Sequence, residues 1–171
     1  MISQASLIFA LSLWPSLVAA QEKVQSVCEI LEHLDRFSGK LVSIRAKVVD
    51  LWLAAEDCKA DIRVEGVGFD NLIAMEWPDS AIVRLKGPKV PFTHDDRSFR
   101  RLEAVLGSTD SHTHSIYADV EGLIVTRNPP QALVWKNLGG ENIRIGFGHL
   151  GQAPAEIIVK LISNIEIVPR K

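Results

Sequence analysis

The chain of 171 residues is poor in the residues on which many common functions depend. It has only two cysteines and no C-x-x-C pair, so it lacks the usual framework of a structural zinc site. Its 19 basic and 21 acidic residues leave a formal charge of −2, which gives no general attraction to nucleic acid or anionic membranes. No G-x-S-x-G segment marks a hydrolase nucleophile. The chain is nonetheless 47% apolar, which is enough for one domain with a real core.

The first twenty residues have the pattern of an export signal. Ala5–Ala20 is an uncharged apolar run with small residues at its end, which suits cleavage before Gln21. The run is shorter than the ~20 apolar residues of a membrane span, although an uncleaved anchor is the alternative because no Lys or Arg precedes it. We expect residues 1–20 to be a signal peptide. Residues 21–171 then form a single domain without a membrane span, in the periplasm or outside a bacterial cell.

The two cysteines, Cys28 and Cys58, both follow the expected cleavage site. In an exported protein an even count predicts one disulfide bond, here closing a loop of about 30 residues. The alternative is a pair of buried free thiols. A metal site is disfavoured because His33 alone does not complete a ligand set with them.

Gly39–Leu53 carries the clearest strand pattern of the chain. Apolar residues from Val42 to Val48 alternate with Ser43, Arg45 and Lys47, and this period of two places the charges on one face. Asp50 falls on the apolar side, so we expect one long first strand with a bulge or bend at that point.

The remaining elements follow from the same kind of periodicity and from capping residues. The expected order is a helix over 24–37, strands over 39–53, 61–65 and 72–77, a helix from Asp95 or Asp96 to about Leu106, and strands over 114–127 and 155–168. This order predicts a mainly β protein with flanking helices (α+β). Its five strands would form an antiparallel OB-like barrel with an N-terminal helix and a second helix between strands 3 and 4. An α+β sandwich of the same elements is the alternative.

Two loops of such a barrel border the surface on which OB-folds usually bind ligands. They are the connection between the first two strands, expected at Ala54–Lys59, and the connection between the last two, expected at Asn128–Pro154.

Three segments together resemble a known group of proteins. They are VCEILEHLDRFSGKLVSIRAKVV at 27–49, Asp57-Cys58, and GFGHLG at Gly146–Gly151. The chain is similar in these segments to uncharacterised small exported bacterial proteins that are thought to be OB-like. The resemblance implies the fold and export, and it carries over no catalytic or binding residue.

The GFGHLG segment permits two interpretations. As G-x-G-x-x-G it matches a dinucleotide fingerprint, but the chain ends about twenty residues later, without room for the second strand and its ribose-binding acid. The favoured interpretation is a glycine-shaped turn in which Phe147 and Leu150 plug one end of the barrel. The other is a ligand loop in which Phe147 and His149 contact the ligand.

A second candidate site is TDSHTH, in which His112 and His114 lie two residues apart near Asp110. Two such histidines on an extended segment point the same way, and imidazole suits zinc or copper. No third strong ligand is placed nearby, so a solvated polar loop is the favoured interpretation.

A nucleic-acid surface on the barrel needs basic residues and stacking aromatics. Arg45 and Lys47 lie on the charged face of the first strand, and Trp52 and Trp135 could stack on bases. Acidic residues on the same kind of face oppose this use, so we expect no tight binding of nucleic acid.

These observations favour an exported, non-catalytic binding or interaction module whose partner is a protein or small molecule, with no cofactor. Its candidate ligand-binding residues are Arg45, Trp135, Phe147 and His149. The alternatives are a metal-assisted hydrolase that uses the loop histidines, and a weak binder of single-stranded nucleic acid or oligosaccharide on the OB face.

Overall fold

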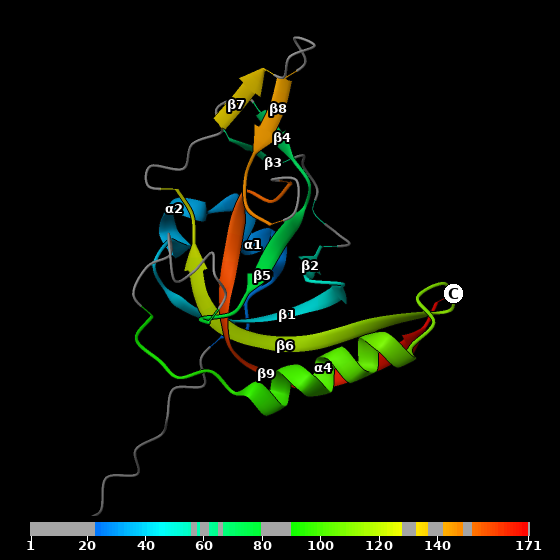
Figure 1. Ribbon diagram of the computed structural model, residues 1–171. Coiled ribbons are helices and arrows are strands. Elements are labelled where there is room, and N and C mark those ends of the chain that lie inside the picture. Colours follow the sequence, from blue (N-terminus) through cyan, green and yellow to red (C-terminus); the bar gives the residue numbers. More distant parts are fainter. Residues whose placement is uncertain are drawn as a thin grey trace, which may run out of the picture.

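The described part of the chain is built mainly of strands, flanked by helices (Figure 1). A computed structural model describes residues 23–55, 58, 62–64, 67–79, 90–127, 133–136, 142–148 and 152–170. In chain order its elements are α1 (Val27–Glu32), α2 (Leu34–Phe37), β1 (Leu41–Val49), β2 (Trp52–Ala54), β3 (Ile62–Val64), β4 (Val67–Phe69), β5 (Leu72–Glu76), α4 (Asp96–Ser108), β6 (His114–Val125), β7 (Leu133–Lys136), β8 (Asn142–Ile145) and β9 (Ala155–Pro169).

Five of the strands close into a barrel in the order β1-β2-β5-β9-β6, and β6 pairs back to β1. The helix α4 lies between the third and fourth barrel strands in sequence, which confirms the OB-like α+β fold. The expectation that all pairs are antiparallel is wrong for one pair, because β5 and β9 run parallel. Parallel neighbours need a long crossover, and the chain from α4 through β8 supplies it.

The first strand is shorter than its sequence pattern predicts. β1 ends at Val49, and β2 pairs back onto it with Trp52 opposite Val49, so Asp50 and Leu51 form a two-residue turn. Asp50 has a φ of 51°, a left-handed conformation that Asp tolerates better than most residues. The predicted bulge in one long strand is therefore a reversal between two barrel strands.

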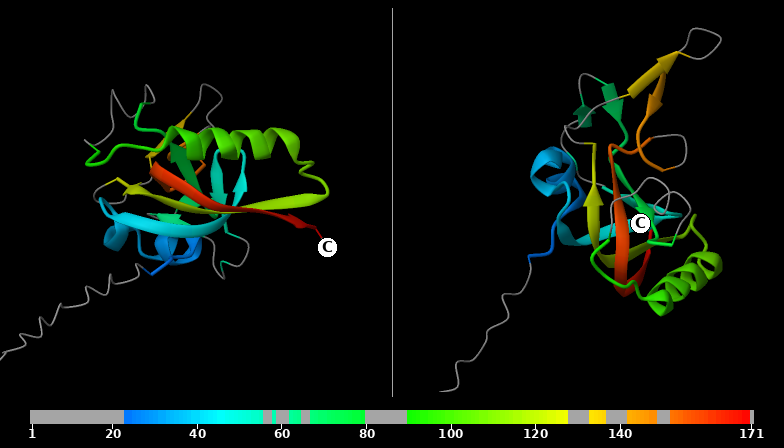
Figure 2. Two further views of the ribbon diagram at one scale, coloured as in Figure 1. Left: turned by 90° about the horizontal axis from the view of Figure 1, so that it is seen from below. Right: turned by 60° about the vertical axis from the view of Figure 1, so that its left-hand side comes forward.

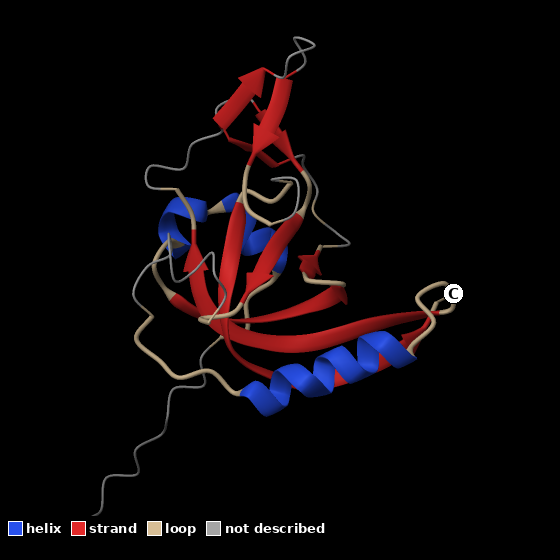
Figure 3. Ribbon diagram, in the orientation of Figure 1, coloured by secondary structure: helices blue, strands red, loops and turns tan. Residues whose placement is uncertain are grey.

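The strand predicted over 61–65 lies outside the barrel. Ile62–Val64 pairs only with β4, in a separate two-stranded sheet, and β2 takes the second barrel position instead. A second hairpin, β7–β8, occupies part of the connection predicted at 128–154. Both hairpins lie beyond the end of the barrel that is farthest from α4 (Figure 3). Alternation of apolar and polar residues identifies a strand but not its partner. For this reason the predicted position of the connection between the first two barrel strands, at 54–59, is wrong, and the connection lies at Asp50 and Leu51.

The N-terminal helix is present but broken. Ser26 caps α1 by accepting a hydrogen bond from the Glu29 N–H at 3.0 Å. At His33 the backbone leaves the helical conformation, and α2 starts at the next residue. The disulfide between Cys28 and Cys58 is confirmed, and it joins α1 to the chain that follows β2.

The helix α4 covers an otherwise open edge of β9. The pairing of β5 with β9 ends at Ile158, which leaves the following β9 backbone without a strand on that side. The Asp95 N–H donates to the Lys160 carbonyl at 2.9 Å, and the Ile162 N–H donates to the Ser98 hydroxyl at 3.1 Å. Asp95 also caps the helix through the Arg97 N–H, as expected. The helix thus satisfies backbone groups that a bare strand edge would leave unpaired.

The strands β6 and β9 form a long ribbon that extends past the barrel. Its pairing shifts register twice, once near Asn164 and once beside Gly122. At Gly122 a Cβ would lie 2.7 Å from Cγ1 of Ile157 and against the Ile158 carbonyl, so the strands approach closely only because this residue is glycine.

The helices lie on opposite sides of the barrel, with α1 and α2 near β1 and α4 against the β6–β9 ribbon (Figure 2). Inside the barrel, inward residues of all five strands form one core, among them Ile44, Leu53, Ile73, Val120 and Ile157. In the part of the chain described here, no helix combines the length and apolarity that crossing a bilayer requires.

Candidate ligand-binding cleft

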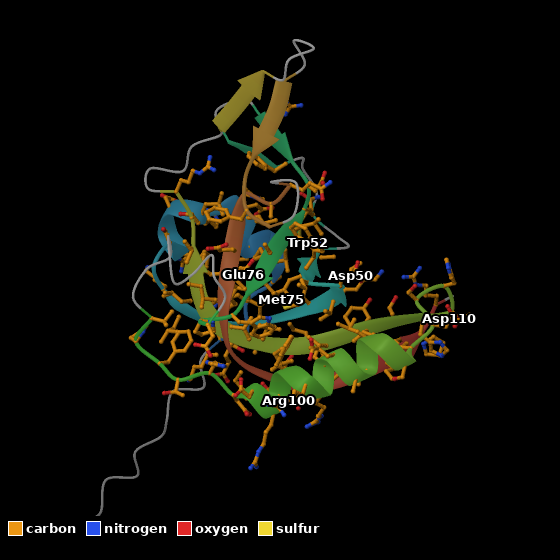
Figure 4. The ribbon with its side chains drawn as sticks, in the orientation of Figure 1. Asp50, Trp52, Met75, Glu76, Arg100 and Asp110 are labelled. Atoms are coloured by element: carbon orange, nitrogen blue, oxygen red, sulfur yellow. A yellow bond between two sulfur atoms is a disulfide. The ribbon has the colours of Figure 1, made fainter. Side chains whose placement is uncertain are left out.

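A cleft of about 290 Å³ lies on the outer face of β2 and β5. Leu53 and Ile73 point into the core, so their neighbours Trp52 and Ala74, which are register partners, point outward. The described residues that line the cleft are Asp50, Leu51, Trp52, Ala74, Met75, Glu76 and Gly148. Four of them, Asp50, Trp52, Met75 and Glu76, are labelled in Figure 4 and lie near β2 and β5, away from Arg100 on α4 and Asp110. This face of an OB barrel is the usual place for a ligand.

Gly148 of the GFGHLG segment forms one wall of the cleft. Its φ of 70° is left-handed, and a Cβ would overlap the six-membered ring of Trp52 and lie 3.0 Å from the Ala74 Cβ. Only glycine combines this conformation with so close an approach. The segment is held by paired hydrogen bonds between Phe147 and Ala153, at 2.8 and 3.3 Å.

Phe147 is half-buried and is not among the described residues of the barrel core. Its ring centroid lies 5.9 Å from the guanidinium carbon of Arg127. Gly148 beside it packs on the outer face of the barrel, and the role of Phe147 as a plug stays a prediction. His149 and Leu150 lie outside the described residues.

Two glutamates stand on the same outer face. Glu156 on β9 is the register partner of Ala74, and parallel partners share a face, so its side chain rises beside the cleft floor. It is only 6% exposed, and within the described chain no hydrogen-bond donor contacts its carboxylate. Burial, and then the negative charge of Glu76, raise the pKa of Glu156 to about 7.

Arg45, a sequence candidate, lies away from this cleft. It projects from β1 beside the register shift near Asn164, where its guanidinium contacts Asp119 at 3.2 Å and Glu166 at 2.6 Å. It also donates to the Asn164 carbonyl at 2.6 Å, and the Asn164 amide donates to Asp119 at 2.6 Å. These contacts satisfy the guanidinium within the fold and leave Arg45 poorly placed for a shared site with Gly148.

The TDSHTH segment is a turn organised by Asp110. Its carboxylate accepts hydrogen bonds from the His112 N–H at 2.9 Å and from the Thr113 hydroxyl at 3.0 Å, which lower the pKa of Asp110. The His114 ring nitrogen Nδ1 lies 2.9 Å from the same Thr113 hydroxyl. His112 is exposed, and among the described residues no group of three potential metal ligands forms. The arrangement accounts for these residues as a polar turn.

Only some of the residues that line the cleft are candidates in the sequence analysis. Trp52 is recognisable as a candidate for stacking, and Gly148 belongs to a candidate motif. Trp135 lies on β7, and its side chain is outside the described part. Glu156 is missed, although an acid directly before the β-branched run Ile157–Val159 is a signal of a buried polar group.

No protein family, no curated protein and no solved structure matches the chain. The interpretation of the cleft therefore rests on its own geometry and chemistry.

Proposed function

We propose that the protein is an exported, non-catalytic binding module whose ligand occupies the cleft on β2 and β5. The observation that carries this proposal is the cleft itself, which is bordered by the Asp50 turn and by Gly148. The two connections that border the OB ligand surface, between strands 1 and 2 and between strands 4 and 5, supply these residues. Trp52 contributes a flat apolar ring, and a small number of polar groups surround it, which is the usual make-up of a small-molecule site.

Export is supported by the apolar run at 5–20 and by the Cys28–Cys58 bond, since disulfides persist in oxidising compartments. The resemblance to small exported OB-like proteins agrees with it. Protein recovered from the periplasm should have the intact mass of a chain that begins at Gln21. Thiol titration of the unfolded, unreduced protein should find no free thiol. A full-length species held in the membrane would contradict this part of the proposal.

The binding proposal is tested by labelling the protein with 5-fluorotryptophan and screening small-molecule fragments by fluorine NMR. After removal of residues 1–20 the chain retains Trp52, Trp77 and Trp135, and substitution of each by Phe assigns the three signals. Trp77 packs against Phe99 of α4 with ring centroids 3.8 Å apart, so its signal is an internal control. We expect fragments that shift Trp52 and leave Trp77 unchanged. If fragments shift other signals but never Trp52, the cleft is not the binding site.

A further inference from the structure

The described residues that line the cleft carry charge of one sign. Among the described residues that line it, Asp50 and Glu76 are acidic and none is basic. A third acid, Glu156, lies beside Glu76 on the same face, nearly buried and without a hydrogen-bond donor in the described chain. An ionised carboxylate in such a place is costly unless a partner neutralises it.

Other acids on the outer face of the barrel have such partners. Arg45 forms ion pairs with Asp119 and Glu166, and Lys160 lies 3.4 Å from Glu121. Among the described acids on the barrel strands, those of the cleft and the neighbouring Glu156 therefore lack a basic partner. A ligand that carries a positive charge would supply it.

The Trp52 ring indicates what kind of cation fits. A metal ion prefers several oxygen ligands in a regular shell, whereas an indole face attracts an organic ammonium group and also packs against its carbon atoms. Gly148 lies against this ring and narrows the cleft, and the volume of about 290 Å³ limits the ligand to a small molecule or one side chain.

We propose that the cleft binds a small alkylammonium group, with its carbon chain on Trp52 and its charge between Asp50 and Glu76. The inference rests on the proposed function, because it assumes that the cleft is a binding site. Two sources share this chemistry, a free primary amine and the lysine side chain of a peptide. Glu156 adds negative charge from the neighbouring strand.

The test uses n-butylammonium, with n-butanol as a neutral control of similar shape. Each is titrated into the fluorotryptophan-labelled protein in phosphate at pH 8, because Tris is itself an amine. We expect a saturable shift of the Trp52 signal with n-butylammonium, and binding at least about tenfold weaker with n-butanol, since a charged hydrogen bond is lost. Equal affinity for both compounds would overturn the inference.

Variants identify the groups that hold the charge. Glu76→Gln should weaken the binding of n-butylammonium about tenfold or more and leave that of n-butanol unchanged. Glu166→Gln removes an acid from the Arg45 cluster instead, and it should change neither affinity. An equal loss in both variants would show a general charge effect and contradict the site. An unchanged Trp77 signal verifies that each variant is folded.

Two further titrations separate the remaining outcomes. The first uses a blocked tripeptide with a central lysine, which shifts the Trp52 signal if the site accepts a lysine side chain. If only the free amine shifts that signal, the ligand is a small amine. Both results support the ammonium site. Calcium that shifts Trp52 while n-butylammonium does not would replace the inference with a metal site. If uncharged fragments shift Trp52 and no ammonium does, the inference fails and the binding function stands. If no compound shifts Trp52, both fail.

Discussion

Two parts of the outer barrel surface handle charge in opposite ways. Around the register shift near Asn164, Arg45 contacts two acids and a backbone carbonyl, so its charge is neutralised within the fold. Beside the β2–β5 cleft, Glu76 and Glu156 lie close together, and no described cation or donor contacts Glu156. We refer to these as the paired surface and the cleft surface.

The comparison shows why an ionisable residue in a strand is weak evidence of function by itself. Arg45 is prominent in the sequence, but its contacts explain it as part of the structure. Glu156 is inconspicuous, yet it is nearly buried, and no donor or cation of the described chain contacts its carboxylate. The following four predictions test this difference, from the largest expected effect to the smallest.

Glu156→Gln should abolish a pH dependence of stability that burial imposes. The pKa of this carboxyl rises from 4.5 to about 7 on folding, so the native state binds more protons between these values. The contribution of Glu156 to stability should therefore be most favourable below pH 4.5, fall as the pH rises, and level off above pH 7. At about 1.4 kcal/mol for each pKa unit, the loss is up to about 3 kcal/mol.

Denaturant melts from pH 4 to pH 8 in buffers without amines measure this effect. The difference in unfolding free energy between Glu156→Gln and the unmodified protein should grow with pH in favour of the variant. Glu166→Gln on the paired surface is the matched control, and its difference should stay small. A flat difference for Glu156→Gln would mean that Glu156 is partnered, and the contrast between the two surfaces would disappear.

Gly148→Ala should destabilise the protein by about 1–3 kcal/mol. The new Cβ meets the Trp52 ring and Ala74, and the backbone has a φ of 70° that a side chain disfavours. Gly107 on α4 is the control, because a Cβ there meets nothing within 4 Å, and Gly107→Ala should be neutral or stabilising. Thermal melts of both variants measure the change in stability. Similar changes in the two variants would show that Gly148 does not support the cleft wall.

Arg45→Met should cost about 1 kcal/mol or less. The side chain is 34% exposed, so solvent screens its ion pairs with Asp119 and Glu166. Denaturant melts at low salt and at 1 M salt should show most of this cost only at low salt. A cost that persists at 1 M salt would show that hydrogen bonding and packing, rather than charge, dominate the paired surface.

Glu76→Gln should lower the pKa of Glu156 without returning it to 4.5. The charge of Glu76 is the smaller cause of the shift, and burial is the larger. The same pH series of denaturant melts, compared with the Glu76→Gln/Glu156→Gln double variant, locates the pKa. A return to 4.5 would make the repulsion between the two acids the main cause.

Much of the architecture follows from local signals in the sequence. Alternation identifies most strands, Ser26 and Asp95 identify helix starts, and the even number of cysteines predicts the disulfide. The order of these elements is sufficient for the OB-like barrel. Each of these signals extends over a few residues or depends on a simple count. It can therefore be recognised directly in one amino-acid sequence.

Strand pairing and the cleft were decided only by the tertiary structure. The alternation around Ile62 and around Trp52 is compatible with either as the second barrel strand, and the short turn at Asp50 selects Trp52. That choice, together with the parallel pairing of β5 and β9, brings Trp52, Ala74 and Glu156 into one row across three strands. The sequence by itself indicated the helices and the strands β1, β5, β6 and β9, but not β2 as a separate strand or the hairpin β7–β8. Which side chains meet on the outer face depended on register between distant strands, because the burial and charge of a residue such as Glu156 are set by its neighbours in space.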